Sequence, residues 1–289
     1  MSKLECIGVS KAYGGHKVLK DISLCLEEHR IYGLIGRNGA GKTTLLSLLS
    51  GQTFAAGGQV LCDGEPVWEN QDALDKICFS REISKTTFFG NKDRMTSDML
   101  KAGAYFYPGW DEDYARELTD IFELDTDKKI TELSDGMRSA LTIVMALASQ
   151  APITFLDEPV AGLDVFMRDR FYKLLLEEYC ESERTFVVST HIIDEATSLL
   201  EDVIILDRGK IVCMENTEEL LERHRMVSGL AEDIDRFCEG RNVVHSETLG
   251  RKKTVCVAID DMAGFRRDAE GYDFDISKAS LQKLFMNLL

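Results

Sequence analysis

Residues Gly36 to Thr43 have the types and the spacing of a loop that binds phosphate groups. They read GRNGAGKT, matching the pattern G-x-x-x-x-G-K-[ST], and they lie between an apolar run at 31–35 and a run predicted to be helical from about 41 to 50. Glycines let successive backbone N–H groups converge on the α- and β-phosphates, Lys42 reaches the β- and γ-phosphates, and the Thr43 hydroxyl can ligate Mg²⁺. The pattern predicts a nucleotide-binding site made of Gly36, Arg37, Asn38, Gly39, Ala40, Gly41, Lys42, Thr43 and Thr44.

A pair of carboxylates follows a second apolar run. Residues Ile153 to Leu156 are predicted to form a buried parallel strand, and Asp157 and Glu158 come directly after it. We expect Asp157 to hold Mg²⁺ through water and Glu158 to polarise the water that attacks the γ-phosphate. Taken alone, the pair also fits a solvated acidic turn. The phosphate loop favours the catalytic interpretation.

Length and charge restrict the class of protein. The chain has 289 residues, 44% of them hydrophobic, which suffices for one large α/β domain and a small appendage. With 50 acidic against 34 basic residues it should be repelled by phosphate backbones, so no nucleic-acid partner is expected. No apolar run approaches the ~20 residues that span a bilayer, and the N-terminus lacks a secretory apolar region. We therefore expect a cytoplasmic chain that reaches the membrane only through another polypeptide.

The cysteines support the same compartment. All eight are scattered without a C-x-x-C pair, and several fall in apolar runs. They are predicted to be small buried hydrophobes in a reducing environment, because neither a disulfide framework nor a zinc site has such spacing.

A third motif precedes the acidic pair. Residues 133–137 read Leu-Ser-Asp-Gly-Met and open a long apolar run at 138–149. Here the chain resembles the ATPase subunits of ABC transporters, whose signature LSGGQ occupies this place. The resemblance extends from Leu4 to about Leu221 and rests on the order and spacing of several short motifs.

The resemblance implies roles for further residues. Tyr13, in KAYGG, corresponds to the aromatic residue that stacks on adenine, and its flat ring suits that contact. Asp164 belongs to the motif that matches the D-loop. His191 follows a β-rich run at 185–189, predicted to be a strand, and corresponds to the histidine that contacts the γ-phosphate. Ser134 and Gly136 begin a helix, and in the family this signature meets the ATP held by the opposite subunit. The resemblance thus implies that two chains form one working site.

Two departures from the family pattern are visible. Asp135 and Met137 replace the Gly and Gln of the signature, and a carboxylate beside a triphosphate would repel it unless the side chain points away. Glu82 stands where the family has a glutamine that touches Mg²⁺ and the membrane subunit. A glutamate oxygen still suits a hard cation.

The resemblance also implies a fold: an α/β P-loop NTPase of the ABC-ATPase type, with an antiparallel β edge, a helical subdomain and a small C-terminal α+β extension. We assign residues 1–225 to the nucleotide-binding domain, about 83–150 of it to the helical subdomain, and 226–289 to the extension. Short β-type runs at 4–9, 22–26, 31–35 and 59–61 are assigned to the antiparallel edge.

Helical patterns at 95–106 and 111–124 fall in the predicted subdomain, and the stretch from Tyr105 to Leu124 resembles a subgroup of bacterial ABC exporters. Residues 109–127 hold eight acids and one base, Arg116. This acidic run is either a solvated helix face or a docking surface for a basic coupling segment of the membrane subunit.

Beyond Arg225 the motifs stop. Val243–Val244 and 254–259 suggest a strand pair, and 280–288 an amphipathic helix. This segment is either a regulatory or dimer-stabilising appendage or a structural lid.

Together these observations predict an ABC-type ATPase that binds ATP and Mg²⁺, dimerises head-to-tail, and drives a separate membrane permease from the inner face of the membrane. Export is expected from the subgroup resemblance. The alternatives are a soluble ABC ATPase that acts as a mechanical switch and a regulatory module that holds ATP without hydrolysing it.

Overall fold

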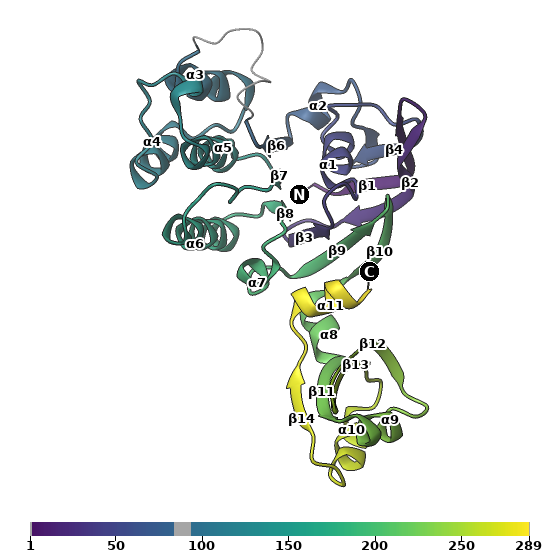
Figure 1. The fold of residues 1–289 in the computed structure, drawn as a ribbon. Helices are drawn as coiled ribbons and strands as arrows, with labels where there is room; N and C mark the ends of the chain where they lie inside the picture. Colours follow the sequence, from purple (N-terminus) through teal and green to yellow (C-terminus); the bar gives the residue numbers. More distant parts are fainter. Residues whose placement is uncertain (1, 84–93, 289) are drawn as a thin grey trace. The chain divides into compact units, whose positions relative to one another are not determined.

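The computed structural model describes residues 2–83 and 94–288, drawn in Figure 1. The chain divides into two compact units, which are treated separately below. One contains residues 1–191 and 204–213, and the other contains 192–203 and 214–289. The predicted boundary after residue 225 falls inside the second unit.

The first unit contains a four-stranded antiparallel sheet in the order β2-β1-β4-β5. Its strands are β1 (Leu4–Tyr13), β2 (His16–Leu26), β4 (Gly57–Cys62) and β5 (Glu65–Pro66). Three of the four predicted β-type runs lie in this sheet. The strands extend further than predicted because polar residues alternate with buried apolar ones along β1 and β2, a pattern typical of a sheet with one covered face.

A six-stranded sheet forms the centre, in the order β10-β9-β3-β8-β7-β6. The strands are β3 (Ile31–Gly36), β6 (Ile77–Arg81), β7 (Ile153–Asp157), β8 (Thr185–Ser189), β9 (Asp202–Asp207) and β10 (Lys210–Asn216). The pairs β3–β8, β8–β7 and β7–β6 are parallel, and every residue of β3, β7 and β8 is buried.

The assignment of 31–35 to the antiparallel edge is therefore wrong. This run is β3, in the interior of the central sheet. A strand without polar alternation fits a sheet whose two faces are both covered.

The helices of the first unit include those predicted at about 41–50, 95–106, 111–124 and after Ser134, and two that were not predicted, at 71–74 and 165–181. They are α1 (Lys42–Leu49), α2 (Gln71–Leu74), α3 (Thr96–Phe106), α4 (Glu112–Ile121), α5 (Asp135–Ala148) and α6 (Val165–Glu181), with a 3₁₀ turn at Ile130–Glu132. Figure 1 shows α3, α4 and α5 gathered on the side of β6 and β7 away from the antiparallel strands. Of the predicted helical subdomain, residues 84–93 lie outside the described part of the chain.

The acidic helix α4 packs by its apolar side. The Asp111 carboxylate accepts the backbone N–H of Tyr114 and so begins the helix. Leu118 is fully buried and Phe122 nearly so, whereas the acidic side chains of the helix lie on its outer face. The predicted apolar spacing at 114, 118, 121 and 122 is thus consistent with this packing.

The second unit contains a sheet of four antiparallel strands where the sequence suggested a pair. The order is β12-β13-β11-β14, and the chain runs β-α-β-β-α-β, a split β-α-β arrangement. Its strands are β11 (His224–Leu230), β12 (Asn242–Leu249), β13 (Lys252–Ala258) and β14 (Asp275–Lys278).

The helices of this unit are α7 (Ile193–Ala196), α8 (Thr217–Glu222), α9 (Ala231–Phe237), α10 (Met262–Ala269) and α11 (Leu281–Leu288). Side chains from α9 and α10 form a core with β11 and β13, in which Val227, Val255 and Val257 meet Phe237 and Phe265. The predicted C-terminal helix corresponds to α11.

Candidate active site

The predicted phosphate loop joins β3 to α1. Gly36 ends the strand, where a Cβ atom would lie 2.5 Å from the carbonyl oxygen of Leu206, so this position accepts only glycine. Gly41 caps α1 with φ 111°, in the region of backbone conformation that favours glycine. Lys42 is the first residue of the helix, is 7% exposed, and donates from Nζ to the Gly36 carbonyl at 2.8 Å. The loop therefore curls over its own lysine at the positive end of α1.

The acidic pair lies against this loop. Thr43 Oγ1 donates to Asp157 Oδ2 at 2.6 Å, and Ser189 Oγ donates to Asp157 Oδ1 at 2.6 Å. Asp157 ends β7 and Ser189 ends the neighbouring strand β8, with which it is in register. The carboxylate is 7% exposed and is held at both oxygens. The sequence predicted Asp157 but missed Ser189, although a hydroxyl at the end of the next predicted strand was a usable signal.

Glu158 lies between Lys42 and His191. Its Oε1 atom lies 3.6 Å from Lys42 Nζ, and its Oε2 atom lies 2.6 Å from His191 Nδ1 and accepts the His191 backbone N–H at 3.3 Å. The Glu158 N–H donates to the Ser189 carbonyl at 3.0 Å. Glu158 has φ 52°, a left-handed conformation that costs about 1–3 kcal/mol in a non-glycine residue. The structure thus brings two other predicted residues, Lys42 and His191, to the Glu158 carboxylate.

The signature residues occupy the start of α5. The Ser134 hydroxyl accepts the Met137 N–H at 3.1 Å, so Ser134 caps the helix, which begins at Asp135. A Cβ atom on Gly136 would lie 2.8 Å from the Gly162 carbonyl oxygen, which explains the glycine there. Asp164 likewise caps its own helix, α6, by accepting the Met167 N–H at 3.0 Å.

Tyr13 ends β1 with 52% of its surface exposed. Beside it lies Lys11, which is 6% exposed and donates from Nζ to Thr53 Oγ1 at 2.7 Å and to the Phe54 carbonyl at 2.6 Å. The same ammonium lies 5.2 Å from the Tyr13 ring centroid and 4.5 Å from that of Phe54. The sequence did not single out Lys11 or Phe54, because the loop at 51–56 carries no motif.

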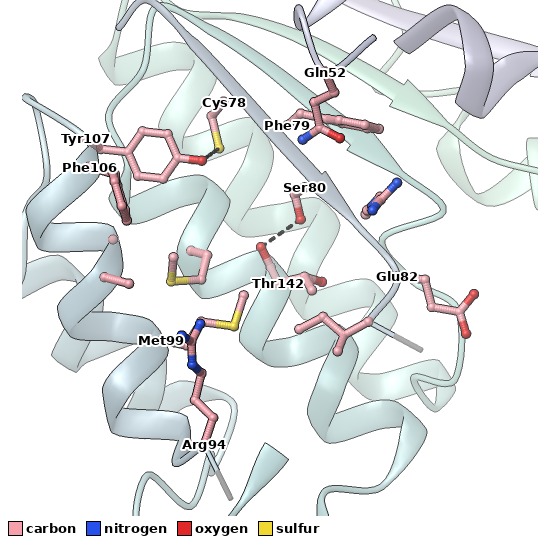
Figure 2. A pocket seen from close by; sticks show the side chains of 15 residues that line it. Gln52, Cys78, Phe79, Ser80, Glu82, Arg94, Met99, Phe106, Tyr107 and Thr142 are labelled. Carbon is pink, nitrogen blue, oxygen red and sulfur yellow. Dashed lines mark hydrogen bonds between the residues drawn. The ribbon is translucent and has the colours of Figure 1, made fainter. Parts of the chain in front are cut away.

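Glu82 follows β6 directly. Arg81 is in register with Asp157, so Glu82 comes at the level of Glu158 along the sheet edge. It also lines a pocket of about 580 Å³ between β6, α3 and α5, shown in Figure 2. Met99, Phe106 and Met145 supply apolar walls to this pocket.

Deeper in this pocket, the Cys78 thiol donates to Tyr107 Oη at 3.3 Å and Ser80 Oγ donates to the Thr142 carbonyl at 2.9 Å. Burial raises the pKa of both the Tyr107 hydroxyl and the Cys78 thiol above their ordinary values. Both groups therefore remain neutral near pH 7 and serve packing.

Comparison with known proteins identifies the family. A family model described as ABC transporter matches residues 19–161. The ABC transporter ATP-binding protein YtrB of Bacillus subtilis is 27% identical over 98% of this chain and 97% of its own length. The Nod factor export ATP-binding protein I of Cupriavidus pinatubonensis is 30% identical over 76% of this chain and 68% of its own.

Solved structures agree in fold. An ATP-binding subunit of an ABC transporter superposes with a TM-score of 0.66 at 22% identity, covering 76% of this chain and 92% of that one. An ATP-binding cassette in a dimeric post-hydrolysis state with ADP and Pi gives a TM-score of 0.64 at 24% identity, over 74% and 98% of the two chains. The predicted α/β fold of the ABC-ATPase type is confirmed. The chain therefore belongs to the family of ABC transporter ATP-binding subunits, and it is an ATPase.

Proposed function

We propose that this chain hydrolyses MgATP with Glu158 as the general base, works as a head-to-tail dimer, and powers a separate membrane permease that exports its substrate. The observation that carries the proposal is the position of Glu158. Its carboxylate lies between Lys42 of the phosphate loop, with which it forms an ion pair at 3.6 Å, and His191, whose backbone N–H and Nδ1 atom both contact Oε2. A base so placed can take a proton from a water at the γ-phosphate.

We assign roles to Lys42, His191 and Tyr13 as well. Lys42 neutralises charge on the β- and γ-phosphates, and the N–H groups of the loop bind the phosphate oxygens. His191 fixes one oxygen of Glu158 and leaves the other directed to the loop side, where Lys42 lies. Tyr13 offers an exposed ring at the end of β1 for adenine.

The oxygen donors at the loop fit a magnesium ion. Thr43 Oγ1 and Asp157 Oδ2 are hard ligands already 2.6 Å apart, and Glu82 comes at the level of Glu158 on the same sheet edge. We assign Thr43 and Asp157, the latter through water, as the protein groups that hold Mg²⁺, with Glu82 as a third. When bound, Mg²⁺ would offset the negative charge that develops on the transferred phosphoryl group.

A second subunit would complete the site. Ser134 and Gly136 stand at the N-terminal end of α5, whose first N–H groups have no partner within the helix, and such an end binds phosphate. In the proposed dimer these residues meet the ATP held by the partner chain, and Asp164 lies at the same boundary. The partner is either a second copy or a related chain.

The pocket between β6, α3 and α5 supports docking of a permease. Its walls are apolar and its rim carries Arg81, Glu82 and Arg94, the composition expected of a groove that receives a short amphipathic helix. Within residues 2–83 and 94–288, no helix is long and apolar enough to cross a bilayer. In the proposed assembly the permease holds this chain at the inner face of the membrane.

Export is supported by the relatives named as Nod factor export ATP-binding protein I, although a sulfate/thiosulfate import ATP-binding protein is also 30% identical over 74% of this chain. Direction is tested by transport assays in inverted vesicles.

The function as a whole is tested by co-expression with a membrane-spanning protein from a neighbouring reading frame, where we expect the permease to be encoded. We expect detergent-solubilised complexes that release phosphate from MgATP and lose this activity with Glu158→Gln. A chain that co-purifies with no membrane protein, and whose ATPase rate no membrane protein changes, would favour the soluble switch instead.

A further inference from the structure

The signature of this chain carries a carboxylate in the first turn of α5. Asp135 is the first residue of that helix, and its side chain is 73% exposed. Acidic side chains in the first turn are attracted by the partial positive charge of the helix N-terminus. A free Asp135 would therefore compete with a phosphate for the same N–H groups, in addition to repelling it.

The Asp135 carboxylate is bound by Arg138 of the same helix. The Arg138 Nη2 atom donates to Asp135 Oδ1, and the Arg138 Nη1 atom donates to the Leu133 carbonyl at 2.5 Å. Residues at i and i+3 share a helix face, so the Asp135 side chain is directed along the helix toward Arg138. The Arg138 side chain is 6% exposed. Its position is therefore fixed more firmly than that of an exposed arginine would be.

The same guanidinium bonds to the residues on either side of Ser134. Leu133 precedes Ser134, and Asp135 follows it, so Arg138 bridges the residues on both sides of the helix cap. On its other side, the first turn of α5 contacts residues 161 and 162. Ser139 Oγ donates to the Ala161 carbonyl, and Gly136 packs against Gly162. The first turn is thus held from two directions, with Asp135 turned toward its own helix.

We propose that Arg138 is a positioning residue: it withdraws the Asp135 carboxylate from the positive end of α5, cancels its charge, and so keeps this end able to bind the phosphates of a nucleotide held by a second chain. The inference rests on the proposed two-chain site. It explains how a signature with an acidic residue remains compatible with Glu158 and His191 in the same chain.

The test is a double-mutant cycle on the purified full-length chain. Arg138→Met should lower steady-state ATPase activity by roughly tenfold or more, the coupling expected of side chains in contact. Asp135→Gly alone should change activity only a few-fold. The double variant, Asp135→Gly with Arg138→Met, should recover to within a few-fold of the wild type, because the charge that Arg138 controls is gone.

Two further readouts separate this role from a structural one. Binding of a fluorescent ATP analogue to the chain's own phosphate loop should be unchanged in all three variants, whereas ATP-dependent dimerisation, measured in the Glu158→Gln background, should fail only with Arg138→Met alone. If Arg138→Met does not fold, Arg138→Lys is used instead. Lysine keeps the charge but cannot bond to the Leu133 carbonyl and the Asp135 carboxylate in the same way, so it should lower ATPase activity less, and Asp135→Gly should reverse that loss too.

A double variant as inactive as Arg138→Met would overturn the role of Arg138. If Glu158→Gln forms no ATP-dependent dimer even with Arg138 intact, the proposed two-chain site is wrong and this inference fails with it.

Discussion

At the scale of single residues, the proposed chemistry depends on a few side chains placed at the ends of parallel strands. The motifs predicted Lys42, Thr43, Asp157, Glu158 and His191, and the structure joins them by contacts of 2.6 to 3.6 Å. Partners outside any motif, such as Ser189, were not found. The Ser189 hydroxyl at the end of a predicted strand was a usable signal, but its contact with Asp157 follows from strand register, which a single sequence does not specify.

Glu158→Gln should lower the steady-state ATPase rate by ~10²-fold or more while ATP binding persists, because the amide keeps the shape of the side chain but cannot act as a base. An ATP-bound dimer should accumulate and be detectable by light scattering. Since Glu158 also contacts Lys42 and His191, a melting curve should confirm that the variant folds normally. Wild-type turnover in a folded variant would remove Glu158 from its assigned role.

Lys42→Ala should abolish nucleotide binding, because it removes the buried cation that we propose faces the β- and γ-phosphates. A binding titration with ATP measures the dissociation constant directly. Lys101→Ala is the matched control, since the Lys101 side chain on α3 is 78% exposed and should leave the constant unaltered. Equal affinities of the Lys42→Ala and wild-type chains would contradict the phosphate-loop assignment.

At the scale of elements, the sequence predicted strands best where burial is uniform. The apolar runs at 153–156 and 185–189 are β7 and β8, almost to the residue. Only two of the four strands in the sheet of the second unit were predicted. β14 was not, because it is four residues long with every side chain exposed and so shows no apolar pattern. β11 was missed because its buried residues alternate with Arg225, Ser228 and Gly229, which weakens its apolar signal.

The antiparallel sheet makes a prediction about alkaline stability. Burial, and secondarily the nearby Asp63 charge, raises the pKa of the Cys62 thiol from 9.0 to about 11, and burial raises that of Cys6 to about 12. Between about pH 9 and 11 the unfolded chain therefore loses these protons while the folded chain keeps them. The free energy of unfolding should fall as pH rises through this window, by up to ~1.4 kcal/mol per pH unit for each thiol.

Denaturant titrations at several pH values check this expectation. Cys62→Ala should show a shallower decline above pH 9, because one titrating group is gone. Val67→Ala also deletes buried volume near this sheet but no ionisable group, so it should lower stability equally at every pH. Parallel declines in Cys62→Ala and the wild type would show that the thiol does not couple to unfolding.

At the scale of the whole molecule, net charge and its distribution govern association. The formal charge of −16 is spread over the chain, but α4 presents a concentrated acidic face that includes Glu117 and Asp120. The sequence left open whether this face is merely solvated or receives a basic segment of the permease. In the structure, α4 packs on α5, and α3 and α5 form walls of the pocket described above, so a permease segment bound in that pocket would lie near α4.

If the α4 face receives a basic segment, Glu117→Gln with Asp120→Asn should weaken co-purification with the permease while leaving the ATPase rate of the isolated chain intact. Opposite charges across an interface mainly accelerate encounter, so the loss should be about tenfold in association rate at low salt and should shrink as the ionic strength approaches 1 M. Surface plasmon resonance on permease held in nanodiscs measures both rate constants. Glu177→Gln with Glu181→Gln removes the same charge from exposed positions on α6 and should have no effect. An equal loss in both pairs would mean that total charge, and not the α4 face, governs docking.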